Sequence, residues 1–247
     1  MGEAVKLQAI VLNKTDYKES DRILTLLSPE KGKLTASARG VKKQASKLRA
    51  GTELFAFGTY VLQETRGRFT VTAFDSIESF HELREDFDRL SAASLLLKLC
   101  DKTAEENEAA PELFLLLLQC LDKLRDQKYS VALVLSVFLF RLCAVMGYMP
   151  ELEHCSRCGR SEELFYLEPR AGGICCSRCA QGRHTAVTGG CLFYMRRILQ
   201  GSVNDAFLLK PTAKQAKELY AAVCGYASYF FEGRLKIMDY LIKYDLV

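Results

Sequence analysis

The sequence Cys155-Ser156-Arg157-Cys158 is followed, after seventeen residues, by Cys176-Ser177-Arg178-Cys179. A C-x2-C pair presents two thiolates from one tight turn, and two such pairs about fifteen to twenty residues apart complete a tetrahedral shell around one ion. Gly159 directly follows the first pair, where such a turn often needs a positive φ. We therefore predict a structural zinc site whose ligands are Cys155, Cys158, Cys176 and Cys179.

Two other uses of these cysteines are less consistent with the sequence. A redox dithiol opens a helix after a strand, and neither pair lies in that context. Disulfides need an oxidising compartment, but the N-terminal stretch lacks an apolar signal region, so we expect a reducing cytoplasm. We expect Cys175 to be unligated. If one of the four cysteines is not a ligand, the residues that could replace it are Cys175, His154 and His184. The remaining helical cysteines, expected to be buried thiols, are Cys100, Cys120, Cys143 and Cys224.

Charge is unevenly distributed along the chain. With 49% hydrophobic and 26% charged residues, the composition is that of an ordinary globular protein of one large or two small domains. The net charge is +4, yet residues 31–49 hold seven cations and no acid, which leaves the remainder at −3. A compact positive segment of this kind favours binding to a polyanion. We call residues 31–49 the basic segment; its cations are Lys31, Lys33, Arg39, Lys42, Lys43, Lys47 and Arg49.

The first eighty residues predict a small β-barrel. Short runs rich in Val, Ile, Leu, Thr and aromatic residues alternate with turn residues. Five strands suit a closed barrel of the OB or the SH3-like type, and the pattern alone leaves both open. The predicted strands are Val5 to Leu12, Arg22 to Ser28, Lys33 to Ala38, Leu54 to Gln63 and Phe69 to Phe80.

The rest of the chain predicts a helical domain that contains the cysteine motif. The fold class is therefore α+β and multidomain, with a barrel over residues 1–81, helices over 82–247 and a zinc knuckle inserted at about 150–185. Val131 to Met146 is strongly apolar, but it is too short for a bilayer, so we expect a buried helix and no membrane span. The predicted helices are Asp86 to Lys102, Pro111 to Arg125, Ser130 to Met146, Cys191 to Leu199, Thr212 to Phe231 and Arg234 to Lys243.

These features predict nucleic-acid binding rather than catalysis. The basic segment joins the third and fourth predicted strands, where flexible cations suit phosphate contacts. Phosphate-binding loops, dinucleotide fingerprints and hydrolase motifs are missing, so we expect no enzyme. The charged stretch 16–22 indicates a turn between strands. Four aromatics could stack on bases, although core positions are favoured for each: Phe55, Phe57, Tyr60 and Phe69.

The order and spacing of several motifs resemble the RecO family of bacterial recombination and DNA-repair proteins. The N-terminal part is similar in Asp16-Tyr17-Lys18-Glu19-Ser20-Asp21-Arg22 and in Ala38-Arg39-Gly40-Val41-Lys42-Lys43. The later part is similar in Gly147, in the two cysteine motifs and in Gly233-Arg234-Leu235-Lys236. The resemblance extends over nearly the full length. Some members lack the cysteines, so the zinc prediction depends on the cysteines of this chain.

The resemblance implies an OB-fold barrel and a non-enzymatic mediator of recombination. Such a protein binds single- and double-stranded DNA, anneals complementary strands, and loads RecA together with RecR and single-strand-binding protein. It also implies a groove for the acidic, apolar C-terminal tail of single-strand-binding protein, for which Lys123, Arg125 and Arg141 are the candidates. Arg141 could instead merely reach the surface from a core helix. The alternatives are a zinc-ribbon module that binds RNA and a dithiol oxidoreductase.

Overall fold

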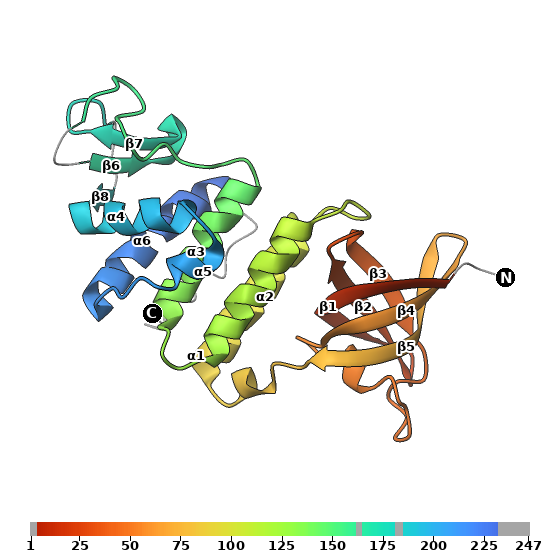
Figure 1. Ribbon diagram of the computed structural model, residues 1–247. Helices are drawn as coiled ribbons and strands as arrows, with labels where there is room; N and C mark the ends of the chain where they lie inside the picture. The colour runs from red at the N-terminus through yellow and green to blue at the C-terminus, as the bar shows by residue number, and fades with distance from the viewer. Residues whose placement is uncertain (1–3, 162–164, 181–184, 232–247) are drawn as a thin grey trace. The chain divides into compact units, whose positions relative to one another are not determined.

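The computed structural model describes residues 4–161, 165–180 and 185–231 (Figure 1). The chain divides into two compact units, residues 1–118 and 119–247. The first holds the barrel, the helix that follows it and the first half of the next helix, and the second holds the rest of that helix, the later helices and the cysteine motif. The predicted boundary after residue 81 stays a prediction, as does the predicted helix Arg234 to Lys243, which lies outside the described residues.

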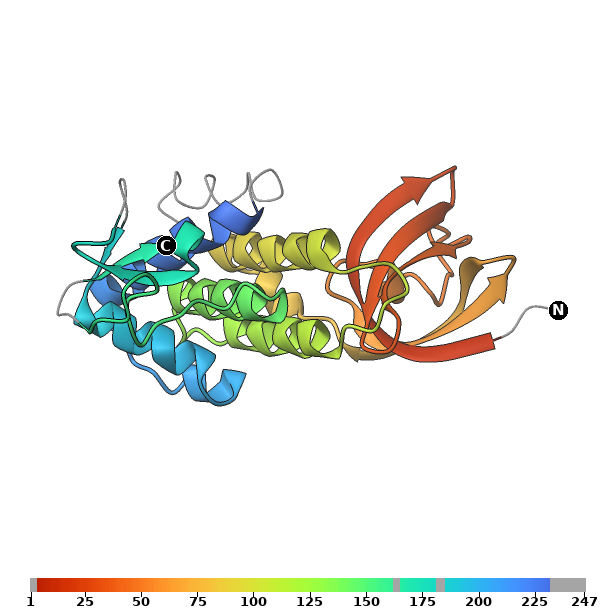
Figure 2. The ribbon, with the colours of Figure 1, turned by 90° about the horizontal axis from the view of Figure 1, so that it is seen from above.

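Five strands form a closed barrel in the order β1-β2-β3-β5-β4, with β4 returning to β1. The pairs are antiparallel except for β3 with β5, which is parallel, and this arrangement is the OB-fold among small barrels. The strands bend strongly in the view from above (Figure 2). The strands are β1 (Ala4–Tyr17), β2 (Asp21–Ser28), β3 (Gly32–Ala38), β4 (Phe57–Thr65) and β5 (Arg68–Glu78).

The long first strand closes the barrel because it pairs with two neighbours. Its first half, Ala4 to Ile10, pairs with β4, and its second half pairs with β2. The register shifts between Val11 and Asn13, and a bulge of this kind bends a strand and increases its twist. Alternate residues of the strands point inward, so that Leu24 and Leu26 are fully buried in the barrel core.

Two strand boundaries differ clearly from the prediction. β1 continues to Tyr17 instead of ending at Leu12, so that the turn predicted over residues 16–22 is confined to residues 18–20. β4 begins at Phe57 instead of Leu54, because Phe55 has φ 70, a left-handed backbone that an extended strand does not allow. The chain between β3 and β4 contains only the short 3-10 helix η1 (Ala50–Thr52). The basic segment therefore occupies a long connection that is built from successive turns.

Helices follow the barrel close to their predicted positions. Asp86 caps the first helix by accepting the N–H groups of Asp88 and Arg89, and Ser130 caps the third. The third helix is buried along most of its length, as predicted. None of the helices among the described residues is both long and apolar enough to span a membrane. The helices are α1 (Phe87–Thr103), α2 (Pro111–Arg125), α3 (Val131–Val145), α4 (Gly189–Leu199), α5 (Val203–Ala206) and α6 (Ala213–Phe231).

A small antiparallel sheet, which the sequence did not predict, lies in the cysteine insert. Its order is β7-β6-β8, where β6 is Phe165–Glu168, β7 is Gly173–Cys176 and β8 is Thr185–Val187. β6 pairs with both neighbours, and the short 3-10 helix η3 (Pro169–Ala171) leads from β6 to β7. This sheet contacts α6, which in turn packs against α3. The cysteine insert thus packs against helices of the second unit.

Candidate metal centre and nucleic-acid interface

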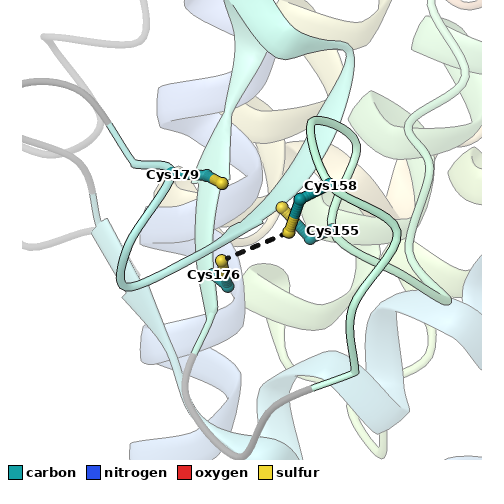
Figure 3. A group of neighbouring side chains, drawn as sticks. All are labelled: Cys155, Cys158, Cys176 and Cys179. Carbon is teal, nitrogen blue, oxygen red and sulfur yellow. Dashed lines mark hydrogen bonds between the residues drawn. The ribbon is translucent and has the colours of Figure 1, made fainter.

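The four predicted ligand sulfurs lie together in one cluster (Figure 3). All four Sγ atoms are within 4.8 Å of one another, and Cys158 Sγ is 3.7 Å from Cys176 Sγ. A tetrahedral ion with metal–sulfur bonds of about 2.3 Å would separate its sulfurs by about 3.8 Å. The cluster therefore has the dimensions of a four-thiolate metal site.

Local hydrogen bonds shape the two cysteine turns. In the first, Gly159 N–H donates to the carbonyl of Cys155 over 2.8 Å, and Gly159 has the predicted positive φ of 71°. In the second, Cys179 N–H donates to the carbonyl of Cys176 over 3.0 Å. Ser156 N–H donates to the carbonyl of Ile174 on β7 over 2.8 Å. The first cysteine turn is therefore hydrogen-bonded to β7, and β7 ends at Cys176, the first residue of the second cysteine turn.

The pKa values of two thiols of the cluster are shifted in opposite directions. Burial alone would raise the pKa of Cys155, but N–H groups of Cys176, Arg157 and Cys158 point at its sulfur and lower that pKa to about 6. The pKa of Cys179 is raised to about 12, first by its hydrogen bonds to Cys158 and Cys176. Several thiolates so close together repel one another, and a bound cation would offset this repulsion. The donor set fits a soft divalent ion such as zinc.

Two of the three neighbours considered as substitute ligands, Cys175 and His154, are not part of the cluster. Cys175 is buried on the other face of β7, where burial and then Glu168 raise its pKa to about 12. His154 is exposed, and its Nδ1 lies 3.1 Å from Ser161 Oγ. His184 lies outside the described residues. As predicted, the helical cysteines Cys100, Cys120, Cys143 and Cys224 are buried.

Five of the seven cations of the basic segment are exposed. These are Arg39, Lys42, Lys43, Lys47 and Arg49. The other two are half-buried at the opposite end of β3. Lys33 Nζ donates to the carbonyl of Asp101 at the end of α1 over 2.8 Å, and Lys31 Nζ lies 5.9 Å from the centre of the Phe69 ring. The exposed five are thus the part of the segment that is best placed to bind a polyanion.

The barrel surface beside Arg39 is hollowed, with a volume of about 750 Å³. Strands β2, β3 and β5 provide its floor, and Lys18, Arg39 and Arg68 bring cations to it from three separate turns or strand ends. Asp21 is the only carboxylate in its lining. The face over strands two and three and the turns beside it are where OB barrels bind oligonucleotides. We call this feature the barrel hollow.

The barrel hollow also decides among the four aromatic candidates. Phe55 and Tyr60 are buried in the core, as favoured by the sequence. Phe57 packs against Phe114 with ring centres 5.8 Å apart. Phe69 lines the barrel hollow but also packs in the barrel core, where it is 9% exposed. Tyr17 lines the hollow as well; it is exposed, and the sequence analysis did not propose it as a stacking residue. Lys18 and Arg68 were missed too, because Lys18 lay in a predicted turn and Arg68 lies outside the basic segment.

The three candidate partner-binding residues lie within the second unit. Lys123 and Arg125, at the end of α2, both pair with Asp122, at 3.3 and 2.8 Å. Arg141 on α3 donates to the carbonyls of Gln200 and Gly201, where α4 ends. Lys123 and Arg141 both lower the pKa of the Cys120 thiol against the larger effect of its burial. The candidates therefore share one neighbourhood.

Fold and sites together define a class of protein: an OB barrel with a basic hollow, joined to a helical unit that carries a four-cysteine cluster. The chain belongs to the RecO family, because the model described as "Recombination protein O N terminal" matches residues 1–80, and that described as "Recombination protein O C terminal" matches residues 84–238. This membership places the chain among the proteins of DNA repair and recombination.

Curated relatives agree with this membership. The "DNA repair protein RecO" of Desulfitobacterium hafniense (strain Y51) is 36% identical over 234 residues, which cover 92% of this chain and 84% of the relative. That of Acetivibrio thermocellus is 28% identical over 246 residues, which cover 98% of both chains. That of Bacillus subtilis (strain 168) is 34% identical and covers 70% of this chain and 68% of the relative.

Proposed function

We propose that this chain is a non-enzymatic, DNA-binding mediator of recombination. The observation that carries the proposal is the barrel hollow, where four cations and the exposed ring of Tyr17 meet beside the exposed part of the basic segment. The four cations are Lys18, Arg22, Arg39 and Arg68. Cations hold phosphates without reading sequence, and aromatic rings stack on any base. Such a surface suits single-stranded DNA in particular, and its charge also serves duplex DNA. Its place of action would be the bacterial cytoplasm, at the nucleoid.

The metal centre has a structural part in this proposal. Zinc held by Cys155, Cys158, Cys176 and Cys179 would tie the first cysteine turn to the small sheet. Four thiolates fill the coordination shell, so a bound water for hydrolysis has no place there. Zinc binding at such a site contributes to folding, and its loss would therefore destabilise the helical unit.

Annealing follows from charge neutralisation. Two complementary strands repel each other through their phosphates, and a basic protein that holds both backbones reduces this repulsion without nucleotide hydrolysis. Within the cell the strands are coated with single-strand-binding protein, so a mediator must also bind this coat. We propose that Lys123, Arg125 and Arg141 bind its acidic tail, and that RecR joins the complex that loads RecA.

A titration of fluorescent single-stranded DNA at several salt concentrations tests the DNA-binding proposal. If about five cations engage phosphates, log K falls against log[salt] with a slope of roughly −3 to −4. The variant Arg39→Glu, Lys42→Glu, Lys43→Glu should lose binding while its circular dichroism spectrum stays native. A matched control makes the same charge change at the exposed Arg197, Lys210 and Lys214 of the helical unit and should bind normally.

Two results would contradict the proposal. Wild-type affinity in the barrel variant, with loss in the control variant, would move the DNA site to the C-terminal helices. Stronger competition by transfer RNA than by unlabelled single-stranded DNA would instead favour the RNA-binding module. The second result would leave the site in place and change its ligand.

A further inference from the structure

Two aspartates hold residues 40–42 of the basic segment against the turn between β1 and β2. Asp21 accepts the N–H of Gly40 at 2.8 Å, and Asp16 accepts Lys42 Nζ at 2.9 Å. Lys42 N–H also donates to the carbonyl of Ser20 over 3.1 Å. Residues 39–42 are therefore fixed to residues 16–21 by backbone and side-chain contacts together.

The far end of the same connection is fixed to the same pair of strands. Arg22 Nη1 donates to Glu53 Oε1 at 2.7 Å and to Thr52 Oγ1 at 2.9 Å, and Lys14 also pairs with Glu53. Between these ends, hydrogen bonds Lys43 N–H to Gly40 O, Ser46 N–H to Lys43 O and Arg49 N–H to Ser46 O form one turn after another. The connection is thus held at both ends, with its cations on a chain of turns between them.

Carboxylates are unfavourable beside a site for a polyanion unless they have another role. Asp21 lies in the lining of the barrel hollow, and Lys18 and Arg39 are close enough to lower its pKa, after the larger effect of the Gly40 N–H. Hydrogen bonds from Lys42 and Arg22 likewise lower the pKa of Asp16. Both carboxyls are therefore ionised at neutral pH and would repel phosphates directly.

We propose that Asp16 and Asp21 are positioning residues that hold Arg39 and Lys42 in place to receive the phosphates of a single DNA strand. This inference rests on the proposed function, since it concerns the same surface. A loop that is preorganised in its binding conformation loses less conformational entropy on binding than a flexible loop. The benefit from holding two cations in place would exceed the repulsion from two carboxylates that are already paired.

The proposal and simple electrostatics predict opposite signs. Removing a negative charge next to bound DNA should tighten binding if charge alone matters. If Asp21 positions the segment, Asp21→Ala should weaken binding of single-stranded DNA by about five- to tenfold, the equivalent of one lost hydrogen bond of typical strength. The salt slope should also become less negative by roughly 0.7, because Arg39 no longer engages its phosphate.

Conservative and control variants sharpen the test. Asp21→Asn keeps an oxygen that can accept the Gly40 N–H, so it should bind nearly as well as wild type. Glu19→Ala removes an exposed charge from the same turn; Glu19 forms no ion pair with any residue that the structure describes, so its loss should leave affinity unchanged or slightly higher. Asp16→Ala, which removes the acceptor for Lys42 Nζ and should also weaken binding, provides a second, independent variant, and thermal unfolding of each checks that the barrel is folded.

The outcomes separate this inference from the proposed function. Loss of binding in the Arg39, Lys42 and Lys43 variant, together with unchanged or tighter binding in Asp21→Ala and Asp16→Ala, would overturn the positioning role and leave the DNA site standing. Wild-type affinity in the triple variant would overturn the DNA site and the positioning role with it. Weaker binding in Asp21→Ala, restored in Asp21→Asn, is the result that we expect.

Discussion

Two arginines occupy the same position in two identical motifs and have different surroundings. Arg157, in Cys155-Ser156-Arg157-Cys158, pairs at 2.7 Å with Glu168, whose side chain is only 1% exposed at the end of β6. This carboxylate raises the pKa of Arg157, and the guanidinium also contacts Cys175. Arg178, in the second motif, is exposed and forms no ion pair among the described residues. Only the first arginine links its cysteine turn to the sheet.

Substitution of these two arginines should therefore have unequal effects on the metal centre. Arg157→Ala leaves the Glu168 carboxylate buried without its cation and should weaken zinc binding by about tenfold, as is common for groups that support metal ligands. Arg178→Ala should bind zinc like wild type. Competition with a chromogenic chelator measures both, starting from protein shown by elemental analysis to hold one zinc per chain.

Three further results would correct this account of the metal centre. Equal losses in Arg157→Ala and Arg178→Ala would mean that the ion pair has no special part. Absence of metal from wild-type protein purified without chelator would remove the zinc proposal. Loss of zinc in Cys175→Ser, which should keep it, would show that the ligand set is different.

At the scale of elements, local sequence signals predicted the helices and most strands. The features that were not predicted, the small sheet and the barrel hollow, depend on contacts between residues that are distant in the sequence. Caps such as Asp86 and Ser130 and the apolar periods are local, so α1 to α3 begin and end within a residue or two of their predicted bounds. The sheet strands β6 to β8 have only three or four residues each, too few for an alternating pattern to register. The barrel hollow needs Lys18 and Arg68 together, and only strand pairing brings them there.

The ends of α2 and α3 carry the proposed site for the coat protein. Arg141 is half-buried, its Nε has no hydrogen-bond partner among the described residues, and burial lowers its pKa. Nearby apolar groups include Tyr129, with Lys123 Nζ 5.6 Å from its ring centre, and Leu208, which is 75% exposed. Cations beside exposed apolar groups suit an acidic, apolar tail.

Charge reversal separates binding of the coat protein from binding of DNA. Arg125→Glu together with Arg141→Glu should slow annealing of strands coated with single-strand-binding protein and spare naked strands. The control changes Arg197 and Lys214 to Glu and should affect neither. Equal losses on coated and naked strands would assign Arg125 and Arg141 to DNA binding or to the fold, and the site of the coat protein would have to be sought elsewhere.

At the scale of the molecule, the proposed DNA site and the candidate metal centre belong to different units. The first unit holds the basic segment and the barrel hollow, and the second holds the four-cysteine cluster and the proposed site for the coat protein. The fold class followed from the sequence because a cysteine motif, a barrel pattern and helical periods occupy separate stretches. The sequence could not predict which cations of the basic segment are exposed. Lys31 and Lys33 are half-buried because Lys31 contacts Phe69 and Lys33 contacts the end of α1, and both contacts form only in the folded chain.

The central claim is that this protein brings complementary DNA strands together by charge and position, without hydrolysing nucleotide. The most direct measurement follows fluorescence as two labelled, complementary strands anneal, with neither ATP nor magnesium present. The wild-type protein should accelerate annealing well above the protein-free rate, and the Arg39→Glu, Lys42→Glu, Lys43→Glu variant should not. A wild-type rate equal to the protein-free rate, or acceleration only when a nucleotide is hydrolysed, would contradict the account.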